Sequence, residues 1–302
     1  MYYLLPGFGN NFSEPCLPRG RRRAFESHLS KTEPAQLTAR PRWCAARDAT
    51  RYSAPGNEHP RVEAHERMAG DLKELLKRVP VVGPLARGAL RLYRNATFPG
   101  SSAYWKGRYS EGGNSGRGSY GAFGEFKAEV VNGLVREFQV GSVIEFGCGD
   151  GNQLALGAYP RYIGLDISVA AIGLCARRFR EDLTKSFFLY DPVCFVDHAG
   201  LFRAELGLSL DVIYHLTEER VFDAYMGHLF SSSSRLIVIY SNDSERPSPS
   251  AHIRYRRFSD WVHARAPQWS LLRRIPNRYP FTGDDRTGSP SDFFVYSRES
   301  KG

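Results

Sequence analysis

From residue 123 onward, the chain alternates between two kinds of hydrophobic pattern. Apolar residues recur at helical spacing from residue 123 to residue 138. Short apolar runs of strand length then follow at residues 143–146, 162–166, 186–190, 206–210 and 236–240. Because strands separated by helices connect through right-handed crossovers, this pattern predicts a doubly wound, mostly parallel sheet.

The first residues of two intervening helices can be predicted from the sequence, and the last two strands are expected to run antiparallel. Ser168 begins a helix, and Thr217 is expected to cap another. Residues 269–275 and 292–296 predict a final antiparallel pair around a polar excursion at residues 276–290. The predicted fold class is α/β: a Rossmann-like sheet of seven strands with an antiparallel last strand, preceded by a helical lead-in.

The first 122 residues lack this regular alternation and divide into two regions. Residues 1–67 contain many prolines and an arginine cluster, so we expect a mostly unstructured basic extension; a natural start at Met68 is the alternative. In the lead-in at residues 68–122, the basic amphipathic run at residues 71–94 favours a helix pair packed on its own domain, or else contact with an anionic membrane surface. The glycine-rich segment at residues 112–120 predicts an ordered lid, before a ligand-binding domain at residues 123–302.

Composition narrows the class of protein. The 302 residues are 42% apolar and 24% charged, which is typical of a folded globular protein. Lys and Arg number 41 against 32 Asp and Glu, and the net charge of +9 favours anionic partners without indicating specific nucleic-acid binding. Five scattered cysteines argue against a disulfide framework and a metal site, and with no leader or long apolar stretch they indicate a cytoplasmic protein.

The strongest chemical signal directly follows the first predicted strand. Three glycines follow Glu145 there, at positions 147, 149 and 151. Glycines at a strand end let the backbone approach a ligand at the carboxyl edge of the sheet. A dinucleotide fingerprint would need a glycine at Asn152, and the acidic Glu145 suits a cationic ligand better than a pyrophosphate. S-adenosylmethionine, which carries an ammonium and a sulfonium, is such a ligand.

With these motifs, the chain from about Gly124 onward resembles the class I S-adenosylmethionine-dependent methyltransferases. It is similar in particular to uncharacterised bacterial members associated with cell-surface saccharide pathways. The resemblance implies that Asp166 holds the ribose hydroxyls, that Asp191 lies beside the adenine amino group, and that Asp211 lies next to the transferable methyl. The complete set of cofactor-binding residues expected is Glu145, Gly147, Cys148, Gly149, Gly151, Asp166, Ile167, Asp191 and Asp211.

Each of these residues also has a purely structural interpretation. The three glycines are consistent with a tight turn alone, and Asp166 with a cap on the helix that begins near Ser168. Cys148 is expected to fill space and not to act as a nucleophile, because it has no basic neighbour in sequence.

Methyl transfer from a sulfonium needs alignment and, for a hydroxyl acceptor, a base. The candidate catalytic residues are His215, Asp211 and His252; the alternative for His215 is a structural bond to backbone. The candidate acceptor-binding residues are Tyr214, His252, Arg254 and Tyr279, and residues 277–279 and 284–286 could wall the pocket.

We expect the acceptor to be a hydroxyl of a small molecule or a saccharide precursor. Two other functions stay open from the sequence: a methyltransferase-like protein that binds cofactor or a partner without turnover, and an NAD-dependent oxidoreductase.

Overall fold

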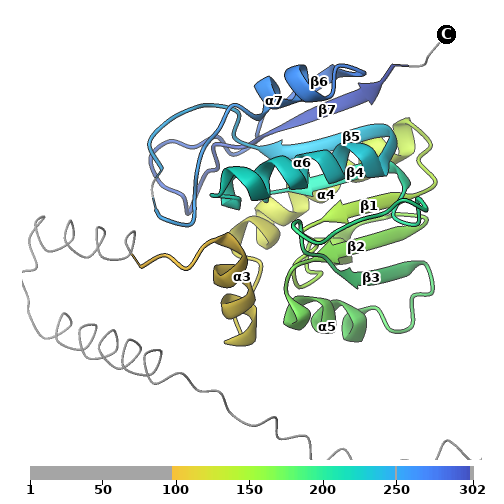
Figure 1. Ribbon diagram of the computed structural model, residues 1–302, viewed down its shortest axis with the longest axis horizontal. Helices are drawn as coiled ribbons and strands as arrows, with labels where there is room; N and C mark the ends of the chain where they lie inside the picture. Colours follow the sequence, from red (N-terminus) through yellow and green to blue (C-terminus); the bar gives the residue numbers. More distant parts are fainter. Residues whose placement is uncertain (1–96, 249, 300–302) are drawn as a thin grey trace, which may run out of the picture. The chain divides into compact units, whose positions relative to one another are not determined.

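The computed structural model describes residues 97–248 and 250–299, which build a seven-stranded sheet in the order β3-β2-β1-β4-β5-β7-β6 (Figure 1). The strands are β1 (Val143–Phe146), β2 (Tyr162–Asp166), β3 (Lys185–Leu189), β4 (Ala204–Leu210), β5 (Ser233–Ser241), β6 (Trp269–Ile275) and β7 (Asp292–Arg298). Strands β1 to β5 pair in parallel, and β7 is antiparallel to both of its neighbours. The predicted Rossmann-like fold is therefore confirmed. The expectations for residues 1–67 and 71–94 lie outside the described residues.

Helices cover both faces of this sheet. They are α4 (Gly121–Glu137), α5 (Val169–Arg178), α6 (Glu219–Ser232) and α7 (Phe258–Arg265), whereas α3 (Ser101–Ser110) contributes to neither core cluster. Alternate residues of β5 point to opposite faces, so Ile237 packs in the cluster with α6 and α7 while Val238 packs in the cluster with α4 and α5. Because β5 is buried on both faces, it reads as a continuous apolar run in the sequence.

The expected cap at Thr217 is wrong. Helix α6 begins at Glu219, after Glu218, and no side chain caps it. The Thr217 hydroxyl instead donates to the Glu218 carboxylate at 3.2 Å. That carboxylate accepts hydrogen bonds from the backbone N–H and the hydroxyl of Ser101, so it fixes the start of α3. The polar residues before α6 therefore hold a neighbouring helix and leave their own helix uncapped.

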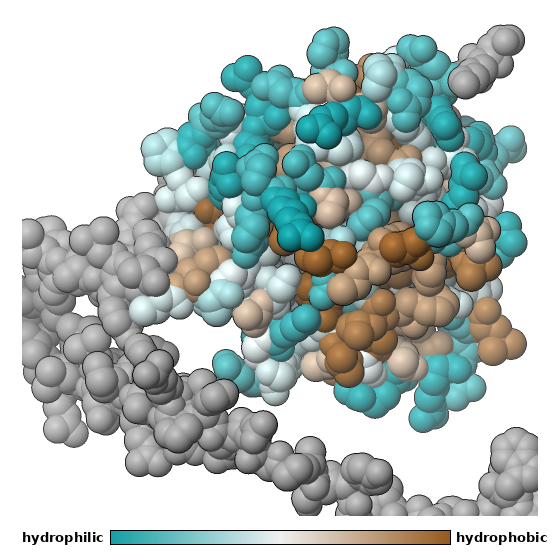
Figure 2. Space-filling model, viewed as in Figure 1, coloured by the Kyte–Doolittle hydropathy of each residue, from teal (hydrophilic) through white to brown (hydrophobic). Residues whose placement is uncertain are grey.

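Apolar side chains remain exposed at the β3 edge of the sheet. The connection from β3 to β4, residues 190–203, contains turns but no helix. Its exposed apolar residues and those of β3 are Phe188, Leu189, Val193, Val196 and Leu201. Figure 2 shows apolar surface gathered in this part of the molecule. No helix in the described part of the chain is long and apolar enough to cross a membrane.

The parallel order brings three chain segments to one place. β1 lies between β2 and β4, and all three strands run in the same direction. Their carboxyl ends therefore meet at the same edge, and the residues that follow them, Gly147, Ile167 and Asp211, come together there. Open α/β sheets bind ligands at this edge.

Candidate active site

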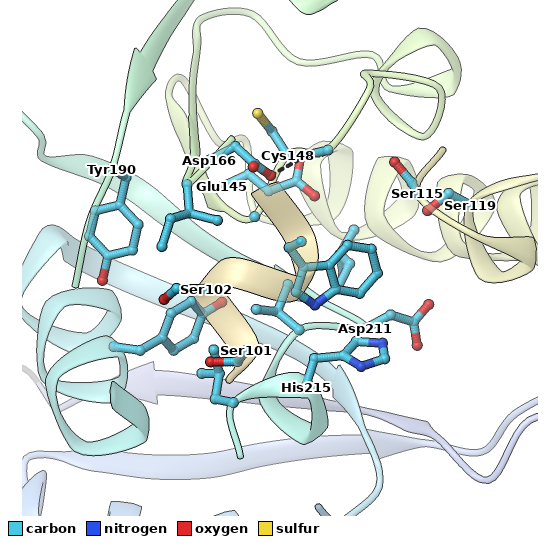
Figure 3. A pocket seen from close by; sticks show the side chains of 18 of the residues that line it. Ser101, Ser102, Ser115, Ser119, Glu145, Cys148, Asp166, Tyr190, Asp211 and His215 are labelled. Carbon is cyan, nitrogen blue, oxygen red and sulfur yellow. Dashed lines mark hydrogen bonds between the residues drawn. The ribbon is translucent and has the colours of Figure 1, made fainter. Parts of the chain in front are cut away.

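The residues that follow β1, β2 and β4 line a single cavity, called here the first cavity (Figure 3). Its lining includes most of the residues expected to bind a cofactor: Glu145, Gly147, Cys148, Gly149, Asp166, Ile167 and Asp211. Trp105 and Tyr109 of α3 and Ser115 of the glycine-rich segment complete the wall. The cavity holds about 110 Å³.

The three glycines are required by the backbone and by their neighbours. All of them adopt positive φ: 87° at Gly147, 59° at Gly149 and 73° at Gly151. A Cβ atom at Gly149 would lie 2.2 Å from the Ser115 hydroxyl oxygen, and one at Gly151 would lie 2.8 Å from the Phe179 ring. Gly151 therefore packs against α5 and does not line the first cavity, whereas Gly147 and Gly149 do.

Two buried carboxylates lie in the wall of the first cavity. Tyr162 donates a hydrogen bond of 2.5 Å to Glu145, and burial raises the pKa of Glu145 to about 7. Asp166 accepts backbone N–H groups of Gly149 and Ser168, both at 2.9 Å, and burial raises its pKa to about 6. Because a raised pKa reflects the cost of ionisation in a buried place, a cationic ligand would stabilise both charged forms.

Asp166 combines the two interpretations that the sequence left open. Its carboxylate organises the turn before α5, but the side chain that caps α5 is Ser168, whose hydroxyl accepts the N–H of Ala171 at 3.3 Å. Asp166 also lines the first cavity. A structural role and a place in the ligand site therefore coexist at this residue.

Gln153 is a residue that sequence reasoning missed. Its side-chain nitrogen donates to the Gly124 carbonyl at 3.0 Å, but its buried oxygen has no hydrogen-bond partner. The residue lines the first cavity. A buried unpaired acceptor is costly, so this oxygen is suited to receive an N–H or O–H of a ligand. In the sequence, its position two residues after Gly151 could have identified Gln153 as a site residue.

The glycine-rich segment packs directly on the glycine loop, where the lid was expected. Asp150 accepts hydrogen bonds from the Ser115 N–H at 3.0 Å and from the Tyr120 hydroxyl at 2.7 Å. The N–H of Asp150 donates to the Ser115 hydroxyl, which also pairs with Tyr109 at 2.9 Å. Burial acts to raise the pKa of Asp150, but these hydrogen bonds lower it overall. The segment is thus held against the glycine loop, and it is called here the cover because Ser115 and Ser119 line the first cavity.

Asp211 lies at the centre of a buried polar cluster. Lys127, whose side chain is 1% exposed, contacts the Asp211 carboxylate at 2.7 Å, and the Tyr214 hydroxyl donates to it at 2.8 Å. Burial, followed by the neighbouring Asp211 charge, raises the pKa of Tyr214, so its hydroxyl keeps its proton. Asp211 has φ of 61°, an uncommon conformation for a residue with a side chain. The sequence suggested Asp211 and Tyr214, but not Lys127 inside an amphipathic helix.

The two candidate histidines stack on each other, and His215 is the one that lines the first cavity. His215 lines the first cavity, and its Nδ1 lies 3.0 Å from the carbonyl oxygen of His252. Because a carbonyl only accepts, Nδ1 carries the proton in this contact. Burial lowers the pKa of His215 to about 4, which makes its ring neutral at pH 7. His252 stacks on Tyr104 of α3 at 4.8 Å and lies outside the lining of the first cavity.

Three other predicted residues do not line the first cavity. Asp191 accepts the N–H of Val193 at 3.0 Å, and its neighbours Tyr190 and Pro192 supply the lining at this position. Arg254 donates to the Thr217 carbonyl and pairs with Glu219 at 3.0 Å. Tyr279 packs edge-on against Phe123 and Phe126 of α4. Cys148 is buried and lines the cavity, and a hydrogen bond to Cys175, followed by burial, raises the pKa of its thiol.

A second cavity, of about 490 Å³, opens beside the first. Asp211 lines both. The other residues of the second wall come from segments far apart in the chain: Arg117, Gly118, Phe123, Tyr214, Tyr240, Arg246, Pro247, Ile253, Tyr255, Phe281, Gly283, Asp284, Asp285, Gly288, Ser289 and Pro290. Within the described residues, no group of three or more His, Cys, Asp or Glu side chains is placed to hold a metal ion.

Comparison with solved structures identifies the fold. The N-methyltransferase NodS from Bradyrhizobium japonicum WM9, solved in complex with S-adenosyl-L-homocysteine, superposes with a TM-score of 0.51 over 66% of this chain and 99% of that one, at 13% identity. This chain has the fold of that methyltransferase.

Two further structures are more distant in shape. Magnesium protoporphyrin IX methyltransferase from Synechocystis PCC 6803 covers 70% of this chain and 100% of its own, with 18% identity and a TM-score of 0.46. The methyltransferase domain of bacterial CtHen1-C covers 58% of this chain and 98% of its own, with 20% identity and a TM-score of 0.47. No family model and no curated protein sequence matches the chain.

Proposed function

We propose that the protein is an S-adenosylmethionine-dependent methyltransferase that acts on a hydroxyl of a small molecule or a saccharide precursor. The observation that carries this proposal is the first cavity, where a loop of positive-φ glycines meets the two buried carboxylates Glu145 and Asp166. Its place at the carboxyl edge of a methyltransferase-type sheet supports the same function.

The residues of the first cavity fit this cofactor by their chemistry. Asp166 offers carboxylate oxygens for the ribose hydroxyls, and Glu145 offers a negative charge for a cationic group. The unpaired oxygen of Gln153 is an acceptor for a ligand N–H. Gly147 and Gly149 leave room where any side chain would fill the wall. The negative charge of Glu145 would repel a pyrophosphate, which argues against the NAD-dependent alternative.

When bound, the cofactor would supply a methyl carbon activated by its sulfonium. The acceptor oxygen would bond to that carbon as the carbon–sulfur bond breaks with its electron pair on sulfur, and the hydroxyl proton would leave to a base. Asp211 is the group we assign to receive that proton, because it lines both cavities. His215 holds a fixed, neutral ring against Trp105, at 4.8 Å between ring centres, and thereby positions the wall. His252, outside the first cavity, supports His215 through its carbonyl group.

The cover must move for the cofactor to enter. At about 110 Å³ the first cavity is smaller than the roughly 300–1,000 Å³ of typical ligand pockets. Ser115, Trp105 and Tyr109 narrow it from one side. We therefore expect α3 and the glycine-rich segment to shift outward on binding and to exclude water afterwards.

Calorimetry with S-adenosylhomocysteine tests the proposal, with NAD as the competing ligand. Asp166→Ala removes charge-assisted hydrogen bonds and should lower affinity roughly ten-fold to a hundred-fold, a cost of about 1.5–3 kcal/mol. The Gly149 and Ser168 N–H groups donate to different oxygens of Asp166, so Asp166→Asn keeps only one of these two bonds and should lower affinity by less than Asp166→Ala. Asp260→Ala, an exposed carboxylate on α7, is the control and should bind normally.

Tight NAD binding with no binding of S-adenosylhomocysteine would overturn the proposal. Binding of the cofactor without methyl transfer to any hydroxyl acceptor, in a screen with labelled methyl donor, would instead identify a binding protein without turnover.

A further inference from the structure

The second cavity adjoins the first where a methyl acceptor would need to lie. The two linings share Asp211, whose carboxylate is 15% exposed and held by Lys127 and Tyr214. Gly118 packs against the same carboxylate, so a Cβ atom there would approach Oδ2 to 2.6 Å. A ligand in the second cavity would therefore reach the first cavity beside Asp211.

The wall of the second cavity combines aromatic rings with charges of both signs. Tyr214, Tyr255 and Phe281 contribute rings, and the Phe281 residue is 44% exposed. Arg246 lies over the Tyr255 ring at 4.8 Å, and Arg117 lies 3.6 Å from Asp285. The arginines disfavour a cationic ligand, and the carboxylates Asp211, Asp284 and Asp285 disfavour an anionic one. The charge pattern favours a neutral ligand with many hydrogen-bonding groups.

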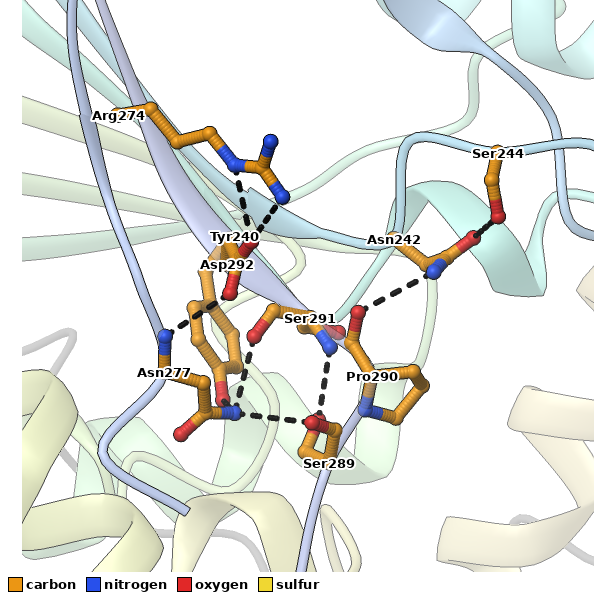
Figure 4. Close-up of polar contacts among 9 residues, drawn as sticks. All are labelled: Tyr240, Asn242, Ser244, Arg274, Asn277, Ser289, Pro290, Ser291 and Asp292. Carbon is orange, nitrogen blue, oxygen red and sulfur yellow. Dashed lines mark hydrogen bonds and ion pairs between the residues drawn. The ribbon is translucent and has the colours of Figure 1, made fainter. Parts of the chain in front are cut away.

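The excursion between β6 and β7 holds part of this wall in a fixed form. Asn277 donates to the Tyr240 hydroxyl at 2.7 Å and to the Ser291 carbonyl at 2.9 Å, so it ties both ends of the excursion to β5 (Figure 4). The N–H of Asn277 donates to Asp292, which also binds Arg274. Residues 281–290 therefore leave the sheet from a rigid base. A fixed wall lowers the entropy cost of binding.

We infer that the second cavity is the acceptor site of the proposed methyltransferase and that it takes a neutral polyhydroxylated ligand of the saccharide class. This inference rests on the proposed function. Aromatic rings cover the C–H faces of a sugar ring, whereas carboxylates accept and guanidinium groups donate hydrogen bonds to its hydroxyls. The hydroxyl nearest Asp211 is the one that becomes methylated, and Asp211 takes its proton.

Saturation-transfer NMR on the full chain with bound S-adenosylhomocysteine tests this inference. The probes are a panel of methyl glycosides of common hexoses and 6-deoxyhexoses, with a matched panel of alkylamines. Phe281→Ala removes a ring of the cavity wall. Its control is Phe188→Ala, a ring of similar exposure, 42%, at the β3 edge. Asp285→Asn, in the cavity wall, is paired with Asp260→Asn on α7.

The expected result is saturation transfer to at least one glycoside that falls at least five-fold in Phe281→Ala and in Asp285→Asn but persists in both controls. The acceptor inference fails if S-adenosylhomocysteine binds but no glycoside shows saturation transfer. It also fails if the saturation transfer is unchanged in Phe281→Ala, and in both cases the proposed function stands. A response confined to the amines also overturns it. Failure of S-adenosylhomocysteine to bind a folded chain, checked by its melting temperature, would count against the proposed function itself.

Discussion

The two cavities of this protein meet at Asp211 but are built in opposite ways. The first lies at the ends of β1, β2 and β4, where the sheet fixes each residue, and a tied segment covers it. The second is larger and more open, and loops that are distant in sequence make its wall. A cavity built by the ends of the sheet suits a ligand that related enzymes share, such as a cofactor. A cavity built by loops suits a ligand that differs from one enzyme to another, such as a methyl acceptor.

This contrast separates what each cavity demands of its residues. In the first, positive-φ glycines and buried carboxylates leave little freedom, because almost any change meets a neighbour. In the second, side chains such as Arg117 and Phe281 are partly exposed. Substitutions where the two cavities meet, at Asp211 and its partners, should therefore lower the free energy of unfolding most. Substitutions in the wall of the second cavity should lower it least.

The largest effect on stability is expected where the two cavities meet, at the Lys127–Asp211 pair. Lys127→Met leaves the Asp211 carboxylate without its buried cation, and removing one partner of a buried pair costs about 3–5 kcal/mol of the free energy of unfolding. Urea denaturation measures it. The double variant Lys127→Met with Asp211→Asn should recover part of the loss, because no uncompensated charge remains. A loss below about 1 kcal/mol in the single variant would mean that water already solvates the pair.

The next largest effect is the pH dependence of the free energy of unfolding that Glu145, in the first cavity, produces. Burial raises the pKa of Glu145 from 4.5 to about 7, so the folded chain binds a proton that the unfolded chain has released. The resulting stability is complete below pH 4.5 and is lost as the pH rises through 7. Between pH 5 and pH 8 the natural protein should lose about 2–3 kcal/mol relative to Glu145→Gln, whose side chain does not ionise.

Comparing the two unfolding profiles isolates this residue. His215, whose pKa burial lowers to about 4, acts in the opposite direction, since the unfolded chain binds the extra proton, but it is present in both proteins and cancels. Parallel profiles from pH 5 to pH 8 would show that Glu145 is ionised in the folded protein and that the first cavity is wetter than its geometry indicates.

A smaller effect is expected in the cover. Ser115→Ala removes the hydroxyl that accepts the Asp150 N–H and pairs with Tyr109. Losing one such anchor costs about 1–1.5 kcal/mol, so S-adenosylhomocysteine should dissociate roughly ten-fold faster in surface plasmon resonance. Ser270→Ala, on β6 and outside both cavities, is the matched control. An unchanged dissociation rate in Ser115→Ala would mean that the cover does not retain the cofactor.

The smallest effect is expected in the second wall. Arg117→Ala breaks an exposed contact with Asp285, so the free energy of unfolding should change by no more than about 0.5 kcal/mol. Affinity for S-adenosylhomocysteine should also stay within about two-fold. A large loss of stability would show that the second wall belongs to the folded core, and the contrast between the two cavities would then fail.

The sequence by itself determined the fold and those residues of the first cavity that lie at the strand ends. Short apolar runs and helical spacing define the parallel sheet, because burial on one or both faces dictates which positions are apolar. Gly147, Gly149 and Asp166 are readable because each directly follows or ends a strand, and strand ends converge by topology. Local pattern and chain order were enough for these residues.

Only the tertiary structure decided the partners of Asp211 and the second cavity. Lys127 reads as the polar residue of an amphipathic helix, yet the packing of α4 buries it against the end of β4. Thr217 has the residue type of a cap, but Glu218 follows it and is held by α3. The second wall joins residues 117–123 to residues 281–290, and no local pattern encodes such contacts. Contacts between side chains that are distant in sequence depend on the whole fold. The order of apolar and polar residues determines the sheet and its strand ends but not these contacts.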